Sequence, residues 1–156
     1  ADEQMGVVIS RTHHVVWERS GSFLMNSIAG IEMQKAQGQI SGFAACVSMV
    51  LKANHVSVDA TALSKKKSAI YPMLAQYMEE PVNLTGATLD QVLYFVSNNK
   101  YVIAVTGDST AVVISGYDTK KITVYNPVSG KVETYKRTQA EKLFKDNGNS
   151  FFSYLN

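Results

Sequence analysis

The sequence predicts one α+β domain in which a mainly helical part precedes a mainly β part. Its 156 residues are 46% hydrophobic and 18% charged, which supplies enough apolar material for one core. Apolar residues recur at helical spacing in the first part of the chain, and short apolar runs separated by turn residues follow. We therefore expect a single domain over residues 1–156, with residues 41–99 mainly helical, residues 101–156 mainly β, and residues 1–35 forming an extension or added strands.

The principal helix is predicted to begin after Ser41, a residue type that caps helix N-termini well. Behind Ser41, apolar residues fall at i, i+3, i+4, i+7 and i+8, the spacing of one helix face. They are Phe43, Cys46, Val47, Val50 and Leu51. This pattern is typical of a buried helix at the centre of a domain.

Four further helices are predicted along the chain. Residues 60–66 and 70–78 show short helical patterns. Thr88 is followed by Gln91, and Thr138 is followed by Glu141, so each threonine is predicted to begin a helix with a capping box.

The strands are predicted from apolar runs bounded by turn residues. They cover residues 101–106, 111–117, 122–125, 131–135 and 151–155, and residues 7–9 and 15–17 also have strand character. Turns are predicted at residues 107–108, 118–120 and 126–130. The four strands from residue 101 to residue 135 should form an antiparallel meander.

Composition excludes several classes of function. The formal net charge is only +2, so we expect no nucleic-acid partner, and Lys65, Lys66 and Lys67 are read as solvated surface. No apolar run approaches the roughly 18 residues of a membrane span, so we expect no membrane insertion. Cys46 is the single cysteine, which excludes an intramolecular disulfide and a cysteine-based zinc cluster. Nothing in the sequence predicts a cofactor or metal.

Three segments resemble the papain-like cysteine peptidases, in particular the double-glycine leader peptidases of bacteriocin exporters and their secreted bacterial relatives. Residues 42–51, GFAACVSMVL, resemble the helix that carries the nucleophile. Residues 111–118, AVVISGYD, resemble the strand that follows the catalytic histidine. Asn126 and Pro127, with Gly130, resemble the turn that carries the third catalytic residue. The resemblance implies a buried helix packed on an antiparallel sheet, in a secreted or surface protein of bacteria.

The chemistry of that family needs a thiolate at a helix N-terminus, an imidazole, a group that orients the imidazole, and donors for the oxyanion. The resemblance places Gly42 where the nucleophile would be and Thr110 where the histidine would be. Asn126 keeps the orienting position, and Gln37 or Gln39 lies near the oxyanion position. All three histidines precede residue 56, so none can come from the meander.

The sequence therefore predicts a catalytically inactive homologue. With Gly42 and Thr110 in place of larger groups, we expect its cleft to be more open than in active relatives. Such a cleft could accept an extended peptide or protein by strand-like pairing. A purely structural role, or a scaffold role between neighbouring domains of a longer chain, is the other interpretation.

A second hypothesis keeps the enzyme active with a rearranged site. It uses Cys46 as nucleophile and His13 or His14 as base, although the apolar stripe favours a buried, inert thiol. Ser41 fits an N-cap better than a nucleophile, and His55 fits the negative end of the helix dipole. His13 and His14 are adjacent in a predicted strand, so they should face opposite sides and bind one metal poorly.

Overall fold

The computed structural model describes residues 24–155, so the predicted strands at residues 7–9 and 15–17, together with His13 and His14, lie outside the described residues. The helices are α1 (Gly42–Ala53), α2 (Ala60–Lys65), α3 (Ile70–Tyr77), α4 (Leu89–Ser97) and α5 (Arg137–Asp146). The strands are β1 (Asn26–Ser27), β2 (Pro81–Asn83), β3 (Val102–Val105), β4 (Ala111–Tyr117), β5 (Lys121–Asn126), β6 (Lys131–Lys136) and β7 (Phe151–Tyr154). The α+β class is confirmed, as are the predicted helices and strands that lie within this range, to within a few residues at their ends.

The strands form one antiparallel sheet in the order β2-β7-β3-β4-β5-β6. Strands β3 to β6 pair in sequence order, which confirms the predicted meander. Strand β1 pairs with Gly116 and Tyr117 at the end of β4. These residues lie beyond Ile114, which pairs with the first residue of β3. Close approach of β1 explains Gly116, because a Cβ there would lie 3.0 Å from the Asn26 carbonyl oxygen.

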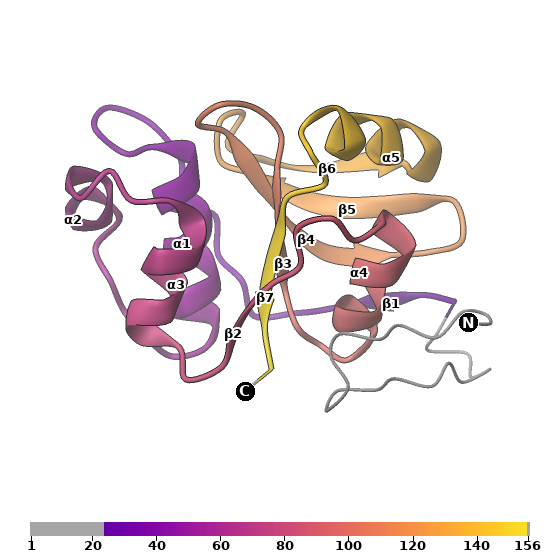
Figure 1. Ribbon diagram of the computed structural model, residues 1–156, viewed down its shortest axis with the longest axis horizontal. Coiled ribbons are helices and arrows are strands. Elements are labelled where there is room, and N and C mark those ends of the chain that lie inside the picture. Colours follow the sequence, from indigo (N-terminus) through magenta and orange to yellow (C-terminus); the bar gives the residue numbers. More distant parts are fainter. Residues whose placement is uncertain (1–23, 156) are drawn as a thin grey trace.

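The helices lie on both faces of the sheet (Figure 1), with α1, α2 and α3 on one side and α4 and α5 on the other. Strand β4 is buried along its whole length and contributes to two cores. Val113 belongs to the core beneath α1, and Ile114 belongs to the core beneath α4. The sheet therefore separates α4 from the other helices of residues 41–99, which the sequence pattern did not indicate.

Two of the predicted helix caps are present. The Ser41 hydroxyl accepts a hydrogen bond from the Ala44 N–H at 3.1 Å, and Thr88 forms a full capping box with Gln91. The capping box predicted at Thr138 is wrong, because α5 begins at Arg137 with Lys136 as its N-cap. The chain passes directly from β6 into this helix.

No helix among residues 24–155 is long and apolar enough to cross a membrane. The same residues include no group of three or more histidine, cysteine, aspartate or glutamate side chains that could hold a metal ion.

Candidate functional site

The N-terminus of α1 is where the resemblance places the peptidase chemistry, and local hydrogen bonds fix its position. Ser41 caps the helix with its side chain, while its own backbone N–H donates to the Ser64 hydroxyl at 3.0 Å. The Ser64 hydroxyl donates in turn to the Ala60 carbonyl oxygen at 2.9 Å. Helix α2 therefore holds the first turn of α1, and the Ser41 hydroxyl is used as the predicted cap.

Gly42, the first residue of α1, is buried against the backbone that leads into β4. A Cβ placed on Gly42 would lie 2.6 Å from the Ser109 carbonyl oxygen and 3.0 Å from the Thr110 Cα. The structure thus places residues 42 and 110 next to each other. It contradicts the expected opening of the cleft at this point, because a glycine lets the two backbones approach where a side chain would separate them.

Thr110 is held in the turn before β4. Its hydroxyl accepts a hydrogen bond from the Thr106 hydroxyl at 3.0 Å, and its carbonyl oxygen accepts one from the Thr106 N–H at 2.9 Å. Gly107 makes room for this side chain, since a Cβ there would lie 2.5 Å from the Thr110 hydroxyl oxygen. Thr110 therefore shapes the turn, and a hydroxyl group cannot act as the base that a peptidase needs near neutral pH.

The side chain of Asn126 forms hydrogen bonds within the hairpin of β5 and β6. Its side-chain oxygen accepts from the Val128 N–H at 3.0 Å and the Ser129 N–H at 3.4 Å, an Asx-type turn. Its side-chain nitrogen donates to Glu133 at 3.0 Å. Tyr125 packs on the α1 face, so strand alternation directs Asn126 to the opposite face. The structure does not aim this amide at the N-terminus of α1.

The hydrogen bonds to Glu133 have an electrostatic consequence. The Asn126 amide, the Ser129 hydroxyl and the Tyr135 hydroxyl together lower the pKa of the Glu133 carboxyl group. Burial, reinforced by Glu133, raises the pKa of Tyr135 to about 12. The hydrogen bonds among Asn126, Glu133 and Tyr135 stabilise the hairpin on the face of the sheet away from α1.

Residues 35–39 run past the same hairpin before they reach α1. The Ala36 N–H donates to the Pro127 carbonyl oxygen at 2.9 Å, and the Lys35 side chain lies against Gly130. Gln37 and Gln39 follow, and both are exposed. Neither glutamine is therefore enclosed in a site where its amide could stabilise an oxyanion.

Cys46 lies one helical turn into α1 and is fully buried in the core beneath this helix. Burial raises the pKa of its thiol far above the ordinary value, so the sulfur stays protonated at neutral pH. The predicted buried core thiol is confirmed. His55 lies two residues beyond the end of the helix, where it is exposed and adopts a left-handed φ of 67°.

The sequence did not single out Ser109, although its carbonyl oxygen occupies the space that a nucleophile at residue 42 would need. The only signal was indirect: a glycine at the first position of a helix, where it is not required for helix formation. A carbonyl group has no residue-specific signature, so this contact could be found only in three dimensions.

No protein-family model matches the sequence, and no curated protein matches it. Among solved structures, the chain is similar to a crystal structure of a candidate C39-like peptidase from Bacillus anthracis. The TM-score is 0.74 and the sequence identity 14%, and the match covers 83% of this chain and 97% of that chain. At this identity the likeness concerns the fold alone, and the chain shares the α+β fold of that C39-like structure.

Proposed function

We propose that this chain is a papain-like domain without peptidase chemistry, which acts as a binding or structural module of a bacterial secreted or surface protein. The contact between Gly42 and Ser109 carries this proposal. A nucleophile needs a Cβ and a sulfur or oxygen beyond it, whereas the Cβ alone would lie 2.6 Å from the Ser109 carbonyl oxygen. Such a separation requires the backbone to shift.

The surrounding side chains support the same interpretation. Thr110 provides no base, and the Asn126 amide is bound within its own hairpin. The alternative, an active peptidase based on Cys46 with His13 or His14, requires a reactive thiolate, whereas the Cys46 thiol is fully buried and protonated. Packing around α1 therefore supports the proposed inactivity, as side-chain identity does.

The close packing at the start of α1 bears on whether the module binds a peptide or has a structural role. The backbone of residues 109–110 lies against residue 42 at the start of α1, which leaves no room there for a side chain. We therefore favour a structural role between neighbouring domains, or a protein partner on the outer surface, over a peptide in the former cleft. The secreted or surface location rests on the resemblance to bacterial relatives.

Hydrolysis of a peptide mixture by the chain including residues 1–23 tests inactivity. The wild-type protein and the Cys46→Ala variant should both leave the mixture uncleaved over long incubation. Cleavage by the wild-type protein that disappears in Cys46→Ala would establish the alternative function and refute this one.

An attempt to restore the site tests the reason for inactivity. The double variant Gly42→Cys/Thr110→His should gain no hydrolysis and should unfold at a lower temperature than Thr110→His alone, because the new Cβ displaces the Ser109 backbone. If the double variant is as stable as Thr110→His and cleaves peptides, steric closure is not what prevents catalysis.

A further inference from the structure

The strongest unexplained feature of the molecule is the open edge of the sheet at β6 (Figure 1). The path of the sheet ends at β2 on one side and at β6 on the other. Strand β2 has three residues and begins with Pro81, which suits an edge that accepts no further strand. Strand β6 has six residues, KVETYK, and is therefore long enough to pair with another strand.

The hydrogen-bond pattern of β6 shows which of its backbone groups face outward. The Arg137 N–H donates to the Lys120 carbonyl oxygen at 2.9 Å, so these two residues occupy a bonded position. Bonded and non-bonded positions alternate along an antiparallel pair, so residues 133 and 135 also bond to β5. The N–H and C=O groups of Val132 and Thr134 point away from β5, where no backbone group among residues 24–155 bonds to them.

Exposed apolar surface accompanies these outward backbone groups. Val132 is 53% exposed, and Val128 in the adjoining turn is 58% exposed. Val132 lies opposite Tyr125, which packs in the core beneath α1, but the helix does not cover the valine itself. A strand added to β6 would satisfy the backbone groups and bury Val132.

The charges on either side of Val132 indicate which strand fits. Lys131 precedes the valine and Glu133 follows it. When a second β6 lies antiparallel with its Val132 opposite this Val132, Lys131 of each copy lies opposite Glu133 of the other. These are non-hydrogen-bonded positions, where facing side chains approach most closely. A two-fold axis at Val132 therefore forms two opposite-charge pairs and buries two valines.

The neighbouring two-fold registers bring like charges together. An axis at Glu133 places this carboxylate opposite the same carboxylate of the second copy. An axis at Thr134 places Lys131 opposite Arg137 of the second copy. Because like charges directly opposite each other are destabilising, the register centred on Val132 is favoured among the three.

We propose that β6 pairs antiparallel with β6 of a second copy of this chain, about a two-fold axis at Val132, so that one sheet continues through both copies. One strand from each copy forms a smaller interface than the roughly 1,200–2,000 Å² of stable complexes, so this dimer is weak and forms at high protein concentration. The pairing needs no property of the α1 N-terminus, so it holds whether or not the chain has peptidase chemistry.

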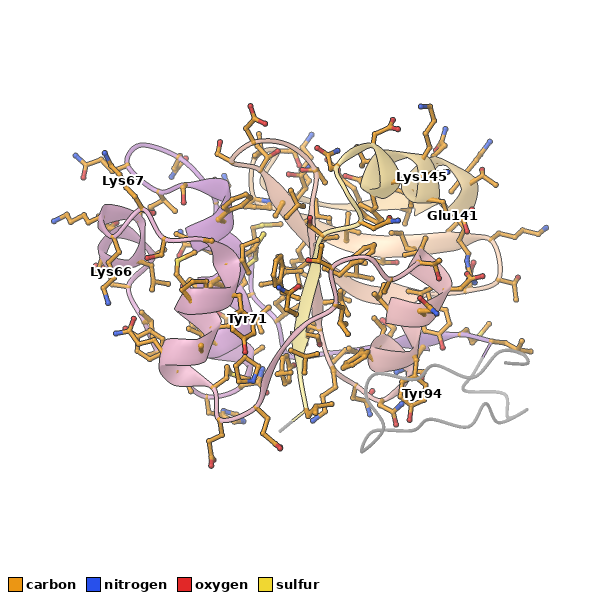
Figure 2. The ribbon with its side chains drawn as sticks, in the orientation of Figure 1. Lys66, Lys67, Tyr71, Tyr94, Glu141 and Lys145 are labelled. Atoms are coloured by element: carbon orange, nitrogen blue, oxygen red, sulfur yellow. The ribbon has the colours of Figure 1, made fainter. Side chains whose placement is uncertain are left out.

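Sedimentation velocity of the full chain, from micromolar to millimolar concentration, tests this proposal. The wild-type protein should pass from monomer to dimer. Lys131→Glu replaces both opposite-charge pairs with like charges and should raise the dissociation constant of the dimer roughly tenfold or more. Lys67→Glu makes the same charge change beside α2, at the opposite end of the molecule from α5 (Figure 2), and should dimerise as the wild-type protein does.

A mixture of two variants tests the register. Glu133→Lys alone should dimerise as poorly as Lys131→Glu alone, because it also places like charges opposite each other. An equimolar mixture of the two should recover dimerisation, since every facing pair again joins opposite charges. Circular dichroism and thermal unfolding of each variant verify that it is folded.

Three results would overturn the proposal. A wild-type chain that stays monomeric over the whole range would leave β6 to a different occupant. Equal dimerisation of the wild-type protein and Lys131→Glu would assign the contact to another surface. A mixture of folded variants that fails to recover would exclude the register centred on Val132.

Discussion

The N-termini of α1 and α5 differ in every respect that matters for chemistry. The start of α1 is capped by Ser41, held by Ser64 and closed by the backbone at Ser109. The start of α5 has no side-chain cap, is surrounded by lysines and opens on a cavity. The comparison teaches that one helix N-terminus can be closed by a side-chain cap and a neighbouring backbone, while positive charge gathers at another.

Gly42→Ala should produce the largest change in the free energy of unfolding. Its sign should be opposite to the usual effect of alanine in place of glycine in a helix. At an exposed helix position, alanine in place of glycine stabilises by about 1 kcal/mol. At Gly42 the new Cβ meets the Ser109 carbonyl oxygen, so we expect a loss of about 2 kcal/mol in the free energy of unfolding, measured by chemical denaturation. A stabilised variant would show that the start of α1 is open.

The burial of Cys46 should make the free energy of unfolding fall at alkaline pH. Burial raises the folded-state pKa above the ordinary value of 9.0, so the contribution of this thiol to stability is complete below pH 9 and falls as the pH rises. Between pH 9 and pH 10, before tyrosines ionise freely, linkage allows a loss of up to about 1.4 kcal/mol for each pH unit. Denaturation at several pH values should show a shallower decline in Cys46→Ala. Identical slopes would place the thiol in contact with solvent.

The N-cap position offers a matched pair of substitutions in the two helices. Ser41→Ala removes a capping hydrogen bond and should lower the free energy of unfolding by about 1 kcal/mol. Lys136→Ala removes no cap in α5 and should not destabilise the protein by a comparable amount. Equal losses in the two variants, measured by denaturant unfolding, would mean that the helix ends do not differ as described.

The smallest expected effect comes from charge at the two ends of α5. Lys136→Gln relieves repulsion with Lys121 and should raise the free energy of unfolding by about 0.5 kcal/mol in low-salt buffer. Lys145→Gln, in the last turn of the same helix, should lower it slightly. Both differences should shrink at high salt. A Lys136→Gln variant that is less stable than wild type would contradict this account of charge repulsion at the start of α5.

Most of the fold could be predicted because its signals are local. Ser41 and the pair Thr88 and Gln91 mark helix starts through side-chain chemistry, and both caps are present. The meander follows from apolar runs with turn residues between them. Strand β2 was missed, since a three-residue strand beginning at Pro81 has little pattern of its own and depends on pairing with β7.

The start of α5 and the candidate site needed three-dimensional information. Thr138 has a capping-box partner in the sequence, but contacts of Arg137 with Lys120 and Asp90 begin the helix earlier. At Gly42 we predicted open space, whereas the structure has close backbone packing. A missing side chain suggests space, whereas here it permits close backbone packing.

Alkylation of the native chain by iodoacetamide, followed by mass spectrometry, tests the proposed absence of peptidase chemistry most directly. Because Cys46 is the single cysteine, labelling reports on one sulfur. The account predicts slow labelling near neutral pH that accelerates only when the protein is unfolded. Rapid labelling of the folded protein, with an apparent pKa below the ordinary thiol value and dependence on His13 or His14, would contradict it.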